Sequence, residues 1–251
     1  MIILVTNDDG VNAKGISELV DCIPAGHDVW VVAPDEPQSG KSSAITVDAA
    51  LRYTEHPEFT GAKAYSVNGT PVDCVKLAMH TILPKRPDLV LSGINHGSNA
   101  GCSIIYSGTM GAALEACIQN VPAVGFSLLH WAPDADFRMC KPWVKKVIVD
   151  VIEKGLPDDC CLNINFPAKV EIEGLKVVKA ARSHWTEEYK EYKDPQGHPF
   201  YMMTGKLINE EPDNDETDLY WLDRNWGTVV PATSDQNLTP AIPDVKDMLG
   251  C

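Results

Sequence analysis

The chain has 251 residues, a length that fits one large α/β domain or one core domain with an appended subdomain. Its residues are 44% hydrophobic and 22% charged, which is typical of a globular protein with a sizeable core and excludes a disordered chain. The formal net charge of −14 repels phosphate backbones and anionic lipids, so we expect neither long nucleic acid nor a membrane as a partner. Phosphate chemistry on so acidic a protein calls for a cation in the site.

Continuous apolar runs and helical periodicity alternate along the first two thirds of the chain. The runs predict buried parallel strands at 2–5, 29–32, 89–91 and 123–126, with further candidates at 44–47 and 65–67. The periodicity predicts helices over 16–23, 72–79, 108–117 and 143–151. We expect the strand at 89–91 to break at Ser92-Gly93. This alternation predicts an α/β fold with a doubly wound, Rossmann-like parallel sheet over residues 1–167.

The pattern changes after about Pro167. Short strand-like runs at 177–178, 200–203 and 228–230 predict hairpins, with an acidic loop at 213–218 between them. We interpret residues 168–251 as a C-terminal extension with hairpins and a terminal segment. Exposed strand edges need a partner, so the extension predicts a homodimer or a homotetramer.

The cysteines and the N-terminal segment favour a reduced compartment. The cysteines are Cys22, Cys74, Cys102, Cys117, Cys140, Cys160, Cys161 and Cys251. None forms a C-x-x-C pair, and we interpret them as free thiols. Met1 leads directly into an apolar strand pattern without the features of a leader peptide, and no apolar run approaches the roughly 20 residues that span a bilayer. We therefore expect a cytoplasmic protein.

The segment Asn7-Asp8-Asp9-Gly10 follows the first predicted strand. In doubly wound sheets, ligands bind beyond the carboxyl ends of the strands. Two adjacent carboxylates repel each other unless a cation lies between them, and oxygen ligands of this kind suit Mg²⁺ or Mn²⁺ rather than zinc. The same residues also fit an Asx turn in which Asp9-Gly10 only caps the next segment. The motif alone does not separate the two interpretations.

Three further polar segments follow predicted strands or begin a helix. The loop from Asp35 to Ser43 ends in a Gly-Lys-Ser similar to a P-loop, but that motif needs glycine where Asp35 stands, so only Ser39 and backbone N–H groups remain of interest. Residues 92–99 supply Asn95 and Asn99, whose amides can bind a metal or a phosphoryl oxygen; His96 in this loop is left out of the set.

The segment 106–113 begins a predicted helix with Ser107, Gly108 and Thr109 in its first turn. Free N–H groups and the helix dipole make such a start an anion site, although an ordinary Ser/Thr cap has the same sequence. Beside three loops that carry oxygen ligands, the anion site is favoured. A cation together with an anion cradle is what phosphoryl transfer to water requires.

These segments together resemble the stationary-phase survival protein (SurE) family of 5′/3′-nucleotidases. The resemblance rests on NDDG at 7–10, P-x-x-x-x-S-G at 34–40, G-T-P-x-D-C-V at 69–75, SGIN-x-G-x-N at 92–99 and YSGT-x-G-A-A at 106–113. It is dense in the N-terminal half of the chain and thin in the C-terminal half. Two departures are Cys102-Ser103, where the family often carries acidic residues, and Val229-Val230-Pro231-Ala232 in place of a V-T-P-L-like segment.

The resemblance implies a divalent-metal nucleoside monophosphatase with one Mg²⁺ or Mn²⁺ ion per subunit. It implies metal ligands at Asp8, Asp9, Ser39 and Asn95, and a phosphate held by Ser107, Gly108 and Thr109. It also implies dimers or tetramers that exchange C-terminal elements.

We expect hydrolysis of nucleoside 5′- and 3′-monophosphates by a metal-activated water. Asp8, Asp9 and Asn95 form the expected catalytic set, and Asn99 joins Ser107 to Thr109 in binding substrate. Three alternatives stay open. One is a covalent aspartyl phosphate, although its usual Asp-x-Asp pattern fails at Gly10. The others are a nucleotide-binding regulatory module without turnover, and a phosphatase of other small esters or short polyphosphate.

Overall fold

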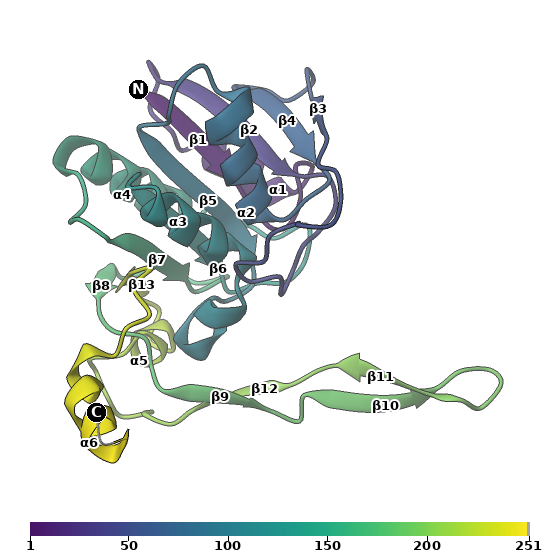
Figure 1. Ribbon diagram of the computed structural model, residues 1–251, viewed down its shortest axis with the longest axis vertical. Helices are drawn as coiled ribbons and strands as arrows, with labels where there is room; N and C mark the ends of the chain where they lie inside the picture. Colours follow the sequence, from purple (N-terminus) through teal and green to yellow (C-terminus); the bar gives the residue numbers. More distant parts are fainter. Residues whose placement is uncertain (250–251) are drawn as a thin grey trace.

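A nine-stranded sheet with helices on both faces forms the body of the protein in the computed structural model, which describes residues 1–249 (Figure 1). In spatial order its strands are β3 (Tyr53–Glu55), β4 (Lys63–Val67), β2 (Asp28–Pro34), β1 (Ile2–Thr6), β5 (Leu89–His96), β6 (Ala123–Leu128), β7 (Cys161–Phe166), β13 (Gly227–Ala232) and β8 (Leu175–Val177). The strands from β4 to β7 are parallel, whereas β3 is antiparallel to β4 and β13 to β7.

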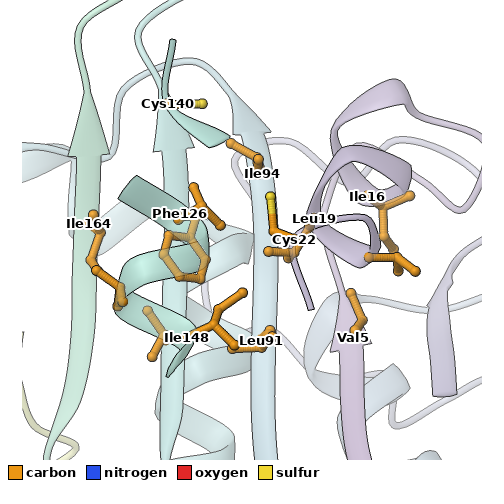
Figure 2. Close-up of a cluster of buried hydrophobic side chains, with 14 of the residues drawn as sticks. Val5, Ile16, Leu19, Cys22, Leu91, Ile94, Phe126, Cys140, Ile148 and Ile164 are labelled. Carbon is orange, nitrogen blue, oxygen red and sulfur yellow. The ribbon is translucent and has the colours of Figure 1, made fainter. Parts of the chain in front are cut away.

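Two helices cover each face of the sheet. They are α1 (Lys14–Val20) and α4 (Lys141–Lys154) on one face, and α2 (Pro71–Leu77) and α3 (Gly108–Ile118) on the other. Figure 2 shows Leu19 of α1 and Ile148 of α4 packed over the strands beside Leu91 and Phe126. Burial of each such side chain stabilises the fold by about 1.5–3 kcal/mol. The predicted doubly wound α/β fold is therefore confirmed.

The order of the strands places the loop after β1 beside the loop after β5. β1 pairs with β2 on one side and with β5 on the other, so the direction of winding reverses between β1 and β5. Loops that follow these two strands diverge to opposite faces and leave a crevice between them, which is where open α/β sheets bind ligands.

Two expected core segments differ from the structure. Residues 44–47, predicted as a strand, form a loop, because the Thr46 backbone N and Oγ1 both donate to Asp73, the residue that also caps the start of α2. The strand predicted to break at Ser92-Gly93 continues to His96, because its pairing with β6 shifts register there and resumes at Asn95 opposite Ser127. Asn95 therefore lies on a strand.

Two of the predicted hairpin strands also pair differently. Val177 lies in β8 and residues 228–230 lie in β13, and both strands join the central sheet instead of forming hairpins. β13 reaches the sheet by pairing antiparallel to β7, a strand that the sequence patterns did not identify. Residues beyond 167 thus complete the edge of the core sheet.

The third predicted hairpin exists and is long. β9 (Ser183–Thr186) pairs with β12 (Lys206–Asn209), and β10 (Tyr189–Lys193) pairs with β11 (Pro199–Met203) further out. Figure 1 shows this ribbon extending well away from the sheet. The remaining described elements are η1 (Ala78–Ile82), η2 (Gly101–Tyr106), α5 (Asp218–Leu222), η3 (Thr239–Ala241) and α6 (Ile242–Leu249).

Seven of the eight cysteines are free thiols in the structure, as the sequence predicts. Four of the seven, Cys22, Cys74, Cys140 and Cys161, are buried and have a raised pKa because burial disfavours the thiolate. Cys251 lies outside the described residues. Within residues 1–249, no helix is long and apolar enough to cross a membrane.

Candidate metal and phosphate site

A pocket of about 640 Å³ opens at the crevice between β1 and β5. Its inner lining comes from four separate segments and includes Asp8, Ser39, Asn95, Asn99 and Ser107. All five are candidates from the sequence. The volume lies within the roughly 300–1,000 Å³ range of small-molecule sites. The structure therefore brings together most of the predicted set, in a space that can hold a nucleotide.

Asp8 is buried at the end of β1 and is held by the start of α3. Its Oδ1 accepts a hydrogen bond of 2.5 Å from Thr109 Oγ1, and its backbone O accepts one of 2.7 Å from the Gln38 N–H. Burial and the neighbouring Asp9 charge raise the pKa of Asp8 to about 6, although hydrogen bonds from Thr109 oppose part of that rise. A carboxylate in this environment gains much from a cation beside it.

The Asp9 side chain points toward His96 at the end of β5. Its Oδ2 accepts a hydrogen bond of 3.0 Å from the His96 backbone N–H, and burial raises the pKa of its carboxyl group. Asp9 does not line the pocket that holds Asp8; it lines a neighbouring one of about 520 Å³. His96 borders both pockets, and its Nδ1 lies 2.8 Å from the Ala132 carbonyl oxygen. The ring of this residue, left out of the predicted set, is thus held in place by the loop after β6.

Ser39 and Asn95 complete the candidate metal ligands with neutral oxygens. Asn95 is buried, and its Nδ2 donates to the Gly97 carbonyl oxygen at 2.8 Å, which leaves its amide oxygen for the pocket. Ser39 is exposed in the loop after β2, next to Gln38, whose N–H donates to Asp8. The loop is therefore tied to the backbone of Asp8, the residue whose carboxylate lines the same pocket.

The start of α3 approaches Asp8 closely. A Cβ atom at Gly108 would lie 2.8 Å from the Asp8 Cβ, so glycine permits this approach. Ser107 caps the helix, because its Oγ accepts a 3.0 Å hydrogen bond from the Met110 N–H. Thr109 is fully buried and its hydroxyl is bonded to Asp8, so its side chain orients the carboxylate and does not reach the pocket.

Comparison with known proteins identifies the family of the chain. The family model described as "Survival protein SurE" matches residues 3–187. The chain is 45% identical over 244 residues to a Flavobacterium psychrophilum protein named 5′-nucleotidase SurE, covering 96% of this chain and 95% of the relative. It is 40% identical over 245 residues to a Bacteroides fragilis protein of the same name, covering 98% and 96%. The chain belongs to the SurE family.

The fold agrees as well. The crystal structure of the SurE protein from Aquifex aeolicus superposes with a TM-score of 0.84 at 32% identity, covering 99% of this chain and all of that one. The resemblance seen in the sequence is therefore confirmed along nearly the whole chain. The thin C-terminal match does not mark a different fold.

In this SurE-family chain, a ladder of polar side chains fixes Asn99 from the neighbouring strands. The Asn99 backbone N–H donates to Asn165 Oδ1 and its carbonyl accepts from Asn163 Nδ2, both at 2.8 Å. Its side-chain Nδ2 donates to Ser127 Oγ at 2.8 Å. Asn163 and Asn165 alternate on β7, so both project to one face at the carboxyl end of the strand. The sequence patterns did not identify these two residues, although the alternating N-x-N pattern could have indicated this support.

The donor set fits a hard divalent cation. Asp8 lines the pocket together with the neutral side chains of Ser39 and Asn95, and among the described residues no lysine or arginine lines it. The adjacent carboxylate of Asp9 lines the neighbouring pocket, which also includes Lys14. Within residues 1–249, no group of three or more His, Cys, Asp or Glu side chains could hold a metal ion. A site that depends on carboxylate, hydroxyl and amide oxygens suits Mg²⁺ or Mn²⁺ and does not suit zinc or copper.

Proposed function

We propose that this chain is a metal-dependent 5′-nucleotidase that hydrolyses nucleoside 5′- and 3′-monophosphates to nucleoside and phosphate. The observation that carries the proposal is the meeting of Asp8, Ser39 and Asn95 with the N-terminus of α3 in one pocket. The names of the relatives support the same activity. Keeping the buried Asp8 carboxylate ionised costs free energy when no positive charge lies beside it, as its raised pKa indicates. A bound cation would remove that cost.

Asp8, Asp9, Ser39 and Asn95 are the proposed ligands of one Mg²⁺ or Mn²⁺ ion per subunit. When bound, a divalent cation would lower the pKa of a water molecule and offset the charge of the phosphate. Thr109 orients Asp8 through its hydroxyl, and the His96 backbone N–H orients Asp9.

The phosphate is proposed to lie at the start of α3. Ser107 and the first-turn N–H group of Gly108 offer donors there, and the helix dipole favours an anion, whereas the Thr109 N–H is directed to the Asp8 carboxylate. Asn99 also lines the pocket, and Asn163 and Asn165 hold its backbone in place. These donors stabilise negative charge on the phosphoryl oxygens as the ester bond breaks.

The assembly is proposed to be a homodimer or a homotetramer. The β10–β11 ribbon exposes Tyr189, Phe200, Tyr201 and Met202, more apolar surface than a solitary ribbon usually leaves in water. We further propose that the residues beyond 167 include the segment exchanged between subunits. The cytoplasmic location stays a prediction from the sequence.

Phosphate release from AMP in the presence of Mg²⁺ or Mn²⁺ tests the proposal. We expect turnover with either metal and arrest by EDTA. Asp8→Asn and Asp9→Asn should each abolish turnover, whereas Asp48→Asn, on an exposed loop outside the pocket, should not. Near-normal turnover in both site variants would overturn the ligand assignment.

A nucleotide-binding module predicts a different result from the same samples. AMP would then raise the melting temperature of the protein, and no phosphate would appear with any of the metals. Trapping of a phosphorylated aspartate during turnover would instead favour a covalent intermediate.

A further inference from the structure

The outer part of the pocket differs in chemistry from its inner part. Beyond the candidate metal and phosphate ligands, the lining includes four large side chains, Tyr106, Trp131, Trp185 and Met203, together with polar residues such as Ser98, Ser103, Glu188 and Thr204. Trp131 lies on the loop after β6, and Trp185 lies on β9 of the long hairpin. The two tryptophans therefore line the pocket from different elements, Trp131 from the sheet edge and Trp185 from the hairpin.

We propose that Trp131 and Trp185 form a nucleobase subsite, in which the base of the substrate stacks on indole faces while the phosphate lies at the start of α3. The inference rests on the proposed nucleotidase function and names the part of the pocket that recognises the rest of the substrate.

Trp131 is held with one ring face against the chain. The position of a Cβ atom at Gly97 would lie 2.4 Å from Trp131 Cζ3 and 2.7 Å from Cε3 and Cη2, the two atoms bonded to it. Nearly equal distances to three consecutive ring atoms place this position over the face of the ring. The Gly97 backbone thus supports one face, while Trp131 remains 71% exposed. The other face of the Trp131 indole is therefore available for stacking.

The strand that carries Trp185 is hydrogen-bonded to the segment that leads to the phosphate end of the pocket. The Cys102 N–H donates to Ser183 Oγ at 2.9 Å, which ties β9 to η2, and η2 leads directly to Ser107. Gly205, on the opposite side of the hairpin, would place a Cβ atom 3.1 Å from Trp185 Cε3. The ring is therefore packed against the hairpin backbone, and the hairpin is fastened near the site.

The charge of the lining suits a neutral base. Among the described residues that line the pocket there is no lysine or arginine, and Glu188 lies at the hairpin end. A second anionic group on the substrate would be repelled there, whereas an uncharged heteroaromatic ring needs only a ring face and an apolar wall. Stacking of a base on an aromatic side chain changes affinity by about 5- to 150-fold.

The test compares AMP with ribose 5-phosphate, which carries the same phosphate ester without a base. For Trp131→Leu and Trp185→Leu, we expect the ratio of kcat/KM for AMP over ribose 5-phosphate to fall at least about fivefold each. Trp131→Phe and Trp185→Phe keep a ring face and should restore much of the ratio. Trp143→Leu, on α4 outside the pocket, should leave the ratio unchanged.

Calorimetric titration with adenosine separates this inference from the proposed function. We expect adenosine to bind the wild-type protein and ribose not to bind, and both Leu variants to weaken adenosine binding. If the wild-type protein releases no phosphate from either ester, the nucleotidase proposal fails while adenosine binding still tests the subsite. An unchanged ratio together with unchanged adenosine binding in both Leu variants overturns the subsite. A changed solution mass with an unchanged ratio would assign the rings to a subunit interface, which also overturns it.

Discussion

The two walls of the pocket are built in opposite ways. The wall at the sheet edge consists of short turns between buried elements, and Asp8, Asn95 and Ser107 on it are nearly inaccessible to solvent. The hairpin wall consists of a two-stranded ribbon whose β10 and β11 residues are all exposed. Backbone hydrogen bonds protected by a core open rarely, whereas exposed ribbons open readily. The groups proposed to bind the metal thus lie on the more stable wall.

This difference predicts that substitutions on the two walls have different effects. Changes at the sheet edge should alter stability and chemistry together, because each side chain there is part of the core. Changes on the hairpin should alter substrate preference or assembly with little effect on the core sheet. Three predictions, from the largest expected effect to the smallest, can break or sharpen this contrast.

The largest effect is expected from Asp8→Asn in the metal-free protein. Folding raises the pKa of this carboxyl group from 3.8 to about 6, so above pH 6 the folded state carries a charge that it disfavours. A shift of about two pKa units corresponds to roughly 3 kcal/mol at neutral pH. The amide carries no charge and can still accept from Thr109. We expect Asp8→Asn to raise the free energy of unfolding in EDTA, while it abolishes turnover.

The pH dependence provides the internal control. The penalty from Asp8 is absent below its unfolded-state pKa, and grows as pH rises from 3.8 to about 6. The gap between Asp8→Asn and wild type in urea unfolding should therefore widen over that range and then level off. Mg²⁺ should stabilise the wild type and not the variant. A gap that is the same at pH 4 and pH 7 would contradict the electrostatic explanation.

The second prediction concerns Thr109→Val, which removes the hydroxyl that donates to Asp8 Oδ1 while keeping the volume of the side chain. Loss of such a supporting hydrogen bond typically lowers metal affinity by about 10- to 100-fold. We expect the Mn²⁺ concentration needed for half-maximal turnover to rise by that factor. Thr60→Val, on an exposed loop, is the matched control. Equal metal dependence in both variants would show that Thr109 does not orient Asp8.

Much of this site could be predicted from the sequence, because its residues lie at strand ends whose identity follows from local patterns. Asp8 and Asp9 follow the apolar run of β1, and Ser107 precedes a run of small residues that predicts a helix. The role of Thr109 could not be predicted. Thr109 was expected to hold the phosphate. In the structure its hydroxyl donates to the Asp8 carboxylate, which the close approach of Gly108 to Asp8 permits.

The pairing of β13 with β7 could not be predicted either, because it joins segments that lie far apart in the sequence. β13 is a short run at residues 227–232, and nothing in it specifies antiparallel pairing with β7 some 60 residues earlier. Strand propensity identifies a strand, whereas its partner depends on which sheet edge is left open after the core has formed. Trp131 and Trp185 were missed in the same way, since their shared pocket exists only once the base of the hairpin lies beside the loop after β6.

The smallest effect on the core is expected from the outer hairpin. Phe200→Ser combined with Met202→Ser removes two exposed apolar side chains of β11, one of them stacked on Tyr192 at 5.7 Å between ring centroids. Exposed substitutions of this kind usually change stability by about 0.5 kcal/mol or less. We expect the urea midpoint of the core to stay nearly constant, and the solution mass measured by light scattering to fall below that of the wild type.

Lys193→Ser, at the end of β10, serves as the control, because it changes an exposed polar position on the same ribbon. The contrast between the two walls requires that the double variant lose assembly without losing the sheet. If its free energy of unfolding falls by several kcal/mol, the ribbon contributes to the core through a partner subunit, and the hairpin wall is rigid in the assembly. If mass and midpoint both stay constant, the exposed aromatic side chains do not hold subunits together, and the contacts between subunits must lie elsewhere on the molecule.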